Sequence, residues 1–323
     1  MLPDKRAVPI LILGVLALIA VPFFAPPYYI ELGTYAFIAA MLALSLQLLV
    51  GCTGLVSLGH AAFYGLAAYT VYLITPEGAG RSMFITLPAA VIVSGIVALA
   101  VGALSLRTRG FFFLMVTLAF GQMVFFVFHD TKIGGGPDGA FLTRPLISIF
   151  DWQLQLTRRQ RPMATYYVAL TFLVAMYLTL VLILRSLFGR VLEGIRVNEH
   201  RMRALGFDTY RYKLAAFVIA GMLAGVAGHM WAMHRAFVNP ELIGWHRSAE
   251  ALLMILLGGM NSLHGPILGA LAYTGLGEFA QIVTERKLLV EGLVILFVVL
   301  LLPNGLSGIR LWRAKDVREA NHG

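Results

Sequence analysis

Runs of about 20 apolar residues recur from one end of this sequence to the other, and each is long enough to cross a hydrocarbon core of about 30 Å as a helix. The 323 residues are 59% hydrophobic and only 13% charged, whereas a soluble domain carries about 25% charged residues. The sequence therefore predicts an all-α, polytopic integral membrane protein with a single membrane domain over residues 1–323. We expect ten spans, at residues 8–25, 30–50, 55–74, 83–105, 110–129, 163–185, 214–236, 248–262, 264–284 and 288–308.

Two of the breaks between these spans are weak, so eight, nine and ten crossings all remain open. The weak breaks are Gly51–Gly54 and Met260–Gly265, each of which is a kink, a re-entrant turn or a true loop. The first apolar run follows Lys5 and Arg6 as a signal peptide would. It lacks a small-x-small cleavage site and leads directly into another span, so we expect it to be retained as the first helix.

The net charge of +9 lies mainly in the connections between the spans. There its ordinary role is to orient a membrane protein rather than to bind nucleic acid. Ten spans place both termini on one side, and the connections on that side include the basic segment 186–213 and the basic cluster 310–318. Because the side richer in Lys and Arg faces the cytoplasm, we expect both termini and segment 186–213 to be cytoplasmic. The long loop 130–162 is then on the outside.

The cytoplasmic segment carries the signals of a short helix with a defined start and end. Asn198 is a favourable N-cap, Glu199 lies in the first turn where the helix dipole favours a negative charge, and Gly206 stands where a left-handed residue ends a helix. Met202 and Leu205 are three residues apart and are expected on one face. A two-turn helix is unstable alone in water, so we expect this one to rest on something and to dock a partner. The alternative is a basic loop that only orients the chain.

Several stretches, ordered along nearly the whole chain, resemble the LivM-type permease subunits of ABC importers for branched-chain amino acids. They are Gly258-Gly-Met-Asn-Ser-Leu-His-Gly-Pro266, Pro303-Asn-Gly305, and residues 54–69, 134–139, 189–199, 204–206 and 212–217. The resemblance implies that a coupling helix at the centre of the cytoplasmic segment contacts the ATPase. The coupling residues implied are Asn198, Glu199, Met202, Arg203, Ala204, Leu205 and Gly206. Such segments commonly carry Ala-Ala soon after the glutamate, where this chain has His200 and Arg201.

The resemblance also implies the rest of an importer in a bacterial inner membrane. Its partners would be a homologous LivH-type permease subunit, two cytoplasmic ATPases of the LivG and LivF types, and a periplasmic or lipid-anchored substrate-binding protein. The implied substrate is leucine, isoleucine or valine, although relatives carry urea, short amides or aromatic acids. The sequence contains no Gly-x-x-x-x-Gly-Lys-Ser/Thr phosphate loop. We therefore expect ATP and Mg²⁺ on the partner subunits, and neither a cofactor nor catalysis in this chain.

Glycines interrupt the apolar sequence around both weak breaks, and short helices broken by glycine in corresponding halves point to a transport path. The two regions also match weakly at a constant offset, which pairs His60 with His264, and both are expected to run in the same direction. The candidate path residues are Ser57, His60, Gly65, Asn261, Ser262 and His264. The alternative is close helix packing, for which Gly265-x-x-x-Gly269 has the required spacing.

Residues 134–139 in the outer loop are too rich in glycine and proline to form a helix. We expect an ordered turn there. It would line the outer mouth, contact the binding protein or simply connect two helices. The candidate residues of this turn are Gly134, Gly135, Gly136, Asp138 and Gly139.

Two other functions are compatible with parts of the sequence. A secondary transporter driven by protons would use Glu278, Glu291 or His60, because ionisable residues inside a membrane usually face a cavity or a partner. An integral-membrane enzyme has little support, because the sequence shows neither a metal cluster nor a nucleophile motif. The histidines within 229–246 lack the i, i+4 spacing of a helical metal site, so we expect no metal. Cys52 is the single cysteine and cannot form an internal disulfide.

Overall fold

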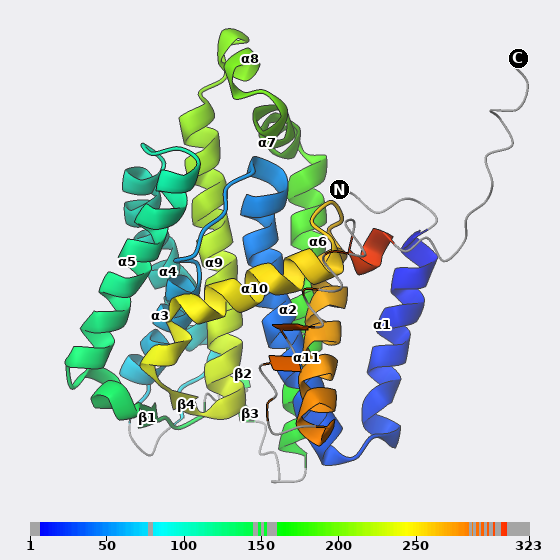
Figure 1. The fold of residues 1–323 in the computed structure, drawn as a ribbon. Helices are drawn as coiled ribbons and strands as arrows, with labels where there is room; N and C mark the ends of the chain where they lie inside the picture. Colours follow the sequence, from blue (N-terminus) through cyan, green and yellow to red (C-terminus); the bar gives the residue numbers. More distant parts are fainter. Residues whose placement is uncertain are drawn as a thin grey trace, which may run out of the picture.

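The computed structural model describes residues 7–76, 80–144, 148–149, 152–153 and 160–283, with shorter pieces between 286 and 308. These residues form a helical bundle in which most helix axes run along one common direction (Figure 1). The first half contains α1 (Ala7–Phe24), α2 (Pro27–Thr53), α3 (Ala61–Ile74), α4 (Met83–Ser105), α5 (Phe111–Asp130), η1 (Ile133–Asp138), β1 (Ala140–Phe141), β2 (Ser148–Ile149) and β3 (Trp152–Gln153). The second half contains α6 (Arg161–Arg185), α7 (Leu187–Val197), α8 (Glu199–Ala204), α9 (Thr209–Arg235), β4 (Phe237–Val238), η2 (Pro240–Leu242), α10 (Trp245–Gly258), α11 (Gly265–Val283) and η3 (Leu306–Gly308).

Five of the described helices are long and apolar enough to cross a membrane, namely α2, α4, α5, α6 and α9. Shorter apolar helices occupy Leu11–Phe24 within α1 and Ala61–Ile74 in α3. The predicted all-α membrane architecture is confirmed, since every strand in the described residues has only two residues. The predicted count of ten spans is not confirmed, because the last one, 288–308, lies mostly outside the described residues.

Both weak breaks prove to be true interruptions of helices. After α2, Gly54 adopts a left-handed φ of +71° and ends the helix, so α3 begins only at Ala61 and the predicted span 55–74 is wrong in its first six residues. After α10, Gly259 has a φ of +109°, and α11 begins at Gly265. The predicted span 248–262 therefore ends four residues early. The residue before each new helix is a histidine, His60 or His264, and these are two residues that the constant offset pairs.

Helix α2 forms the centre of the bundle. In the most apolar 18-residue window of α2, 94% is buried, whereas the corresponding windows of α4, α5 and α6 are only 22% to 33% buried. It packs chiefly against α9, α11 and α6. Pro27 is favourable at its first position, where a backbone N–H would have no partner within the helix. The outer helices instead expose large apolar side chains such as Ile92, Phe111 and Phe112, as helices facing lipid do.

Glycines allow the closest contacts between the inner helices, as the packing alternative predicted. A Cβ atom on Gly228 of α9 would lie 1.9 Å from the Tyr64 carbonyl oxygen of α3. One on Gly269 of α11 would lie 1.8 Å from the Met254 carbonyl oxygen of α10. Backbones that approach this closely gain van der Waals contact, which is what holds helices together in lipid.

The two ends of the bundle differ. Helices α7 and α8 form one end, at the top of Figure 1, and α8 is its outermost element. At the opposite end β1 pairs with β4 and β2 pairs with β3, each pair antiparallel. Helix α10 runs obliquely across the other helices near the middle of the bundle (Figure 1).

Candidate functional site

Helix α7 lies in segment 186–213, supports the predicted coupling helix α8 and was not predicted from the sequence. The Ser186 hydroxyl caps its first turn by accepting a hydrogen bond from the Gly189 N–H at 3.4 Å. Val191, Leu192 and Ile195 form its buried face. These apolar residues stand at positions i, i+1 and i+4 with charged residues among them. This pattern is the signal that could have identified the amphipathic helix.

Helix α8 begins and ends where the sequence predicted. The Asn198 side chain accepts a hydrogen bond from the Arg201 N–H at 2.9 Å, which is the predicted N-cap. Gly206 has a φ of +89° and follows the last turn, where the Phe207 N–H donates to the Met202 carbonyl at 3.1 Å. Both ends of this short helix are therefore fixed by local hydrogen bonds.

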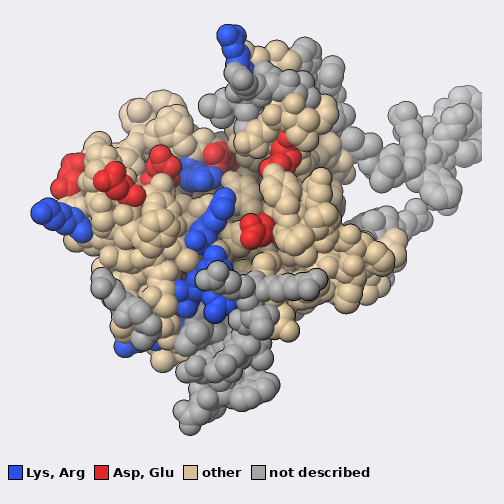
Figure 2. Space-filling view, turned by 90° about the horizontal axis from the view of Figure 1, so that it is seen from below, with Lys and Arg blue, Asp and Glu red and all other residues tan. Residues whose placement is uncertain are grey.

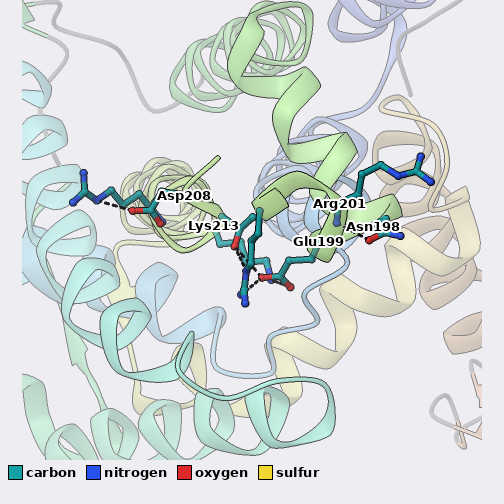
Figure 3. A network of polar contacts seen from close by, with 8 residues as sticks. Asn198, Glu199, Arg201, Asp208 and Lys213 are labelled. Atoms are coloured by element: carbon teal, nitrogen blue, oxygen red, sulfur yellow. Dashed lines mark hydrogen bonds and ion pairs between the residues drawn. The ribbon is translucent and has the colours of Figure 1, made fainter. Parts of the chain in front are cut away.

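Glu199 joins α8 to α9, as Figure 3 shows. Its carboxylate accepts hydrogen bonds from Arg203 Nη2 at 2.5 Å, Lys213 Nζ at 2.6 Å and Thr209 Oγ1 at 3.0 Å. Partial burial acts to raise the pKa of Glu199, but Lys213 and the hydroxyl and guanidinium donors outweigh it and lower the pKa to about 2. The group is therefore a carboxylate at neutral pH and holds α8 against the first turns of α9. The sequence indicated only its favourable place in the helix dipole.

The two apolar side chains that were predicted to share one face of α8 lie in different environments. Met202 is half-buried and its sulfur rests on Gly194 of α7, where an added Cβ would lie 2.7 Å from Sδ. Leu205 follows the last helical residue and is 66% exposed. Arg203 and Ala204 are also exposed. The Leu205 N–H still donates to the Arg201 carbonyl at 3.0 Å, so the two side chains differ in what packs against them, since α7 covers Met202 and leaves Leu205 exposed.

Arg196 connects α7 to both breaks. Its guanidinium donates to the carbonyl of Gly51 in the last turn of α2 and, at 3.5 Å, to Asn261 Oδ1 between α10 and α11. The buried Gln47 of α2 donates from Nε2 to the Met260 carbonyl at 2.7 Å. The candidate path residue Asn261 therefore lies next to the coupling segment. Neither Arg196 nor Gln47 was identified from the sequence.

The candidate path residues before and within α3 are buried inside this chain. His60 is fully buried, with its Nε2 2.8 Å from Ser45 Oγ of α2. Ser57 is buried and lines a hollow between α3, α4 and α5. Gly65 lies directly against η2, since an added Cβ would be 2.3 Å from Ile243 Cγ1. Gly65 is therefore a close-packing position in this structure.

The candidate path residues before α11 are more accessible. The Ser262 hydroxyl lies 2.8 Å from the hydroxyl of Ser307 in η3. Asn261 is exposed and His264 is half-buried. The structure does not bring the two groups of candidates into one cluster. Helix α2 connects them instead, since it contacts His60 through Ser45 and the 259–264 turn through Gln47.

The glycine-rich stretch at 134–139 is an ordered turn, as predicted. Gly134, Gly135, Gly136 and Gly139 all have positive φ, between +63° and +85°. An added Cβ on Gly134 would lie 2.3 Å from the ring of Tyr69, and Asp138 is exposed. The loop therefore closes over the end of α3 opposite α8.

The acidic residues considered for proton transport occupy different positions. Glu278 accepts a hydrogen bond from the hydroxyl of Tyr28, in the first turn of α2, so it lies near a span end rather than deep in the bundle. Glu291 lies outside the described residues. Within the part of the chain that the structure describes, His, Cys, Asp and Glu side chains form no group that could hold a metal ion.

Residues 28–299 match the family described as Branched-chain amino acid transport system / permease component. The chain is 32% identical to the high-affinity branched-chain amino acid transport system permease protein LivM of Salmonella typhimurium, over 89% of this chain and 72% of that protein. It is 31% identical to LivM of Escherichia coli over the same shares, and 25% identical to LivH of Escherichia coli over 83% of this chain and 91% of that protein. No solved structure matches. The chain is therefore a member of the branched-chain amino acid transport permease family.

Proposed function

We propose that this chain is a transmembrane permease subunit of an ATP-driven importer for leucine, isoleucine and valine. It forms the path together with a homologous permease subunit, and its similarity to both LivM and LivH relatives supports such a pairing. A separate binding protein delivers the substrate at the end that carries the β strands. Separate ATPases bind ATP and Mg²⁺ and dock at α8, so that end and both termini are cytoplasmic in an inner membrane.

The observation that carries this proposal is the rigid anchoring of an exposed helix at one end of the bundle. An isolated six-residue helix would be largely unfolded in water, yet α8 is capped by Asn198 and bound to α9 through Glu199 and Lys213. Moving a two-state protein from 1:99 to 99:1 takes about 5.5 kcal/mol of differential binding. A helix fixed at several points can transmit such energy, whereas a flexible loop cannot.

Deletion of Glu199–Gly206 tests the coupling role. The shortened chain should still insert into the membrane but should no longer bind the ATPases or support uptake of leucine. Uptake that continues without the ATPases and follows the proton gradient would instead establish a secondary transporter. Uptake of urea or an amide in place of leucine would retain the importer and change its substrate.

Cysteine labelling tests the orientation. In a Cys52→Ser background, His200→Cys should react with an impermeant maleimide only from the cytoplasm and Asp138→Cys only from the outside. Both side chains are exposed, so accessibility does not limit either reaction. The reverse pattern would show that α8 faces outward, where no ATPase could reach it.

A further inference from the structure

A polar cavity opens at the end of the bundle opposite α8, between the ends of three helices. Its volume is about 100 Å³, which holds several water molecules and therefore one small oxyanion. Figure 2 looks at this end and shows Lys and Arg side chains gathered near its middle, with acidic side chains beside them. The polar lining consists of Glu31 and Thr34 in the first turns of α2, Thr165 near the start of α6, His234 and Arg235 in the last turn of α9, and Arg144.

The pairing of β1 with β4 brings Arg144 to this cavity. The two strands are antiparallel, and their pairing continues for one more residue, because the Leu142 N–H donates to the Ala236 carbonyl at 3.0 Å. Arg144 follows two residues later on one segment, and Arg235 directly precedes Ala236 on the other. The strand pairing therefore places both arginines at the end of α9.

The two guanidinium groups meet at the cavity without an acidic partner. Among the described residues, neither Arg144 nor Arg235 takes part in an ion pair, and the charges of both act on His234. The Arg235 guanidinium lies 5.7 Å from the centre of the Trp231 ring, a contact that favours its position. Because a cleft lined by one sign of charge concentrates the opposite ion, this cavity favours an anion.

The hydrogen-bonding groups around the cavity also suit an anion. The hydroxyls of Thr34 and Thr165 donate to the carbonyls of Ile30 at 2.8 Å and of Arg161 at 3.0 Å, so the side-chain donors left to the cavity are those of its two arginines and of His234. The first turns of α2 and α6 add the positive ends of two helix dipoles. The negative end of α9 carries two basic residues of its own.

Glu31 is an acid in this otherwise basic cavity. It is exposed and forms no ion pair with any described residue. Its carboxylate would repel an anion without protons, such as sulfate. Phosphate keeps at least one proton at neutral pH, so it can donate a hydrogen bond to Glu31 while the arginines bind its other oxygens. The charges of the cavity therefore match a protonated phosphate group.

We propose that this cavity binds one protonated phosphate group, supplied as inorganic phosphate or as the phosphomonoester head group of a lipid. Arg144 and Arg235 bind the charged oxygens, and Glu31 accepts the hydrogen bond from the P–OH group. The bound group joins the first turns of α2 and α6 to the last turn of α9. The site does not depend on which solute the protein transports.

Equilibrium binding of radiolabelled phosphate to the full chain in phosphatidylcholine nanodiscs tests this proposal. We expect saturable binding, with sulfate competing at least tenfold more weakly than unlabelled phosphate. Arg144→Gln and Arg235→Gln should each weaken phosphate binding at least tenfold. The matched control is Arg81→Gln, which removes an exposed charge just before α4 that does not line the cavity. It should change phosphate binding less than twofold.

Glu31→Gln tests the role of the acid in a way that misfolding cannot imitate. The amide no longer repels sulfate and can donate a hydrogen bond to it. In this variant sulfate should therefore compete within twofold of phosphate. Tryptophan fluorescence of each variant without phosphate verifies that the variant is folded.

Lipid composition separates the two sources of the phosphate group. If phosphatidate in the nanodisc displaces the label and phosphatidylglycerol, a phosphodiester without a P–OH group, does not, the ligand is a lipid head group. If neither lipid displaces the label, the ligand is inorganic phosphate.

Three results would overturn the inference. The first is the absence of saturable phosphate binding to the wild type, and the second is equal binding by the wild type and both arginine variants. The third is equal competition by sulfate and phosphate in the wild type. If the arginines instead bind an acidic side chain of a partner protein, both variants lose import although the wild type binds no phosphate, which is the first of these results.

Discussion

Replacing Glu199 with glutamine should loosen α8 from α9 without changing the shape of the side chain. If the carboxylate were fully removed from water, a lowering of the pKa of Glu199 from 4.5 to about 2 would correspond to about 3 kcal/mol of stabilisation. The side chain is 24% exposed and its partner Arg203 is 43% exposed, so water and salt screen much of this interaction. We therefore expect Glu199→Gln to destabilise the docked helix by about 1 kcal/mol.

Hydrogen exchange of the amides in 199–206 measures this effect directly. About 1 kcal/mol corresponds to roughly fivefold faster exchange, since exchange follows the free energy of local opening. Because the pKa of Glu199 is lowered on folding, its stabilisation is fully present above pH 4.5 and is lost as the pH falls toward 2. The ratio of exchange rates between variant and wild type should therefore be constant from pH 6 to pH 8.

Arg211→Gln provides the matched control. Arg211 pairs with Asp208 at 2.9 Å in the same segment, but its side chain is 84% exposed, and exposed pairs contribute little. In Arg211→Gln we expect the exchange rates of the amides in 199–206 to change less than twofold. The reasoning is refuted if Glu199→Gln has no larger effect than Arg211→Gln, or if its effect disappears within the neutral pH range.

Three further outcomes follow from the contacts around the breaks and the caps. Asn198→Ala should destabilise α8 by about 1 kcal/mol, measured by the same exchange, whereas Asn198→Asp should retain the cap. Arg196→Gln should lower leucine import severalfold while ATPase binding, measured by co-purification, is unchanged. Gly269→Ala would place a Cβ 1.8 Å from the Met254 carbonyl oxygen. It should lower the free energy of unfolding by about 1–3 kcal/mol, as is typical of overpacking. Gly275→Ala on the same helix meets open space and should be neutral or stabilising, so equal losses in both would contradict the packing argument.

The features predicted well are those that depend on neighbouring residues. The ends of α8 at Asn198 and Gly206 follow from local capping chemistry, which a sequence displays directly. The start of α3 at Ala61 was missed because residues 54–60 are nearly as apolar as a helix interior, and hydropathy does not separate extended chain from helix. Helix α7 was missed because glycines and arginines interrupt its short apolar pattern.

The contacts that define the candidate sites join residues far apart in the sequence, so no local pattern could reveal them. Lys213 meets Glu199 only because α9 turns back beside α8. Arg196 meets Asn261 only because α7 packs against α2 and the turn after α10 comes within reach of it. Arg144 reaches the cavity beside Arg235 only because β1 pairs with β4. Composition gave the class of the protein, while its polar clusters depend on the tertiary packing.

The contacts from α8 inward form one continuous series, and this decides what each variant can report. Met202 of α8 rests on α7, and Arg196 of α7 holds the last turn of α2 and the turn before α11. A displacement of α8 must therefore either move these two breaks or break a contact between α8 and α7 or at Arg196. Glu199→Gln loosens α8, the outer end of this series, from α9, so it should impair ATPase docking and import together. Arg196→Gln weakens it further inward, so it should impair import alone, and a loss of docking in that variant would mean that α7 and α8 do not act as a separate rigid unit.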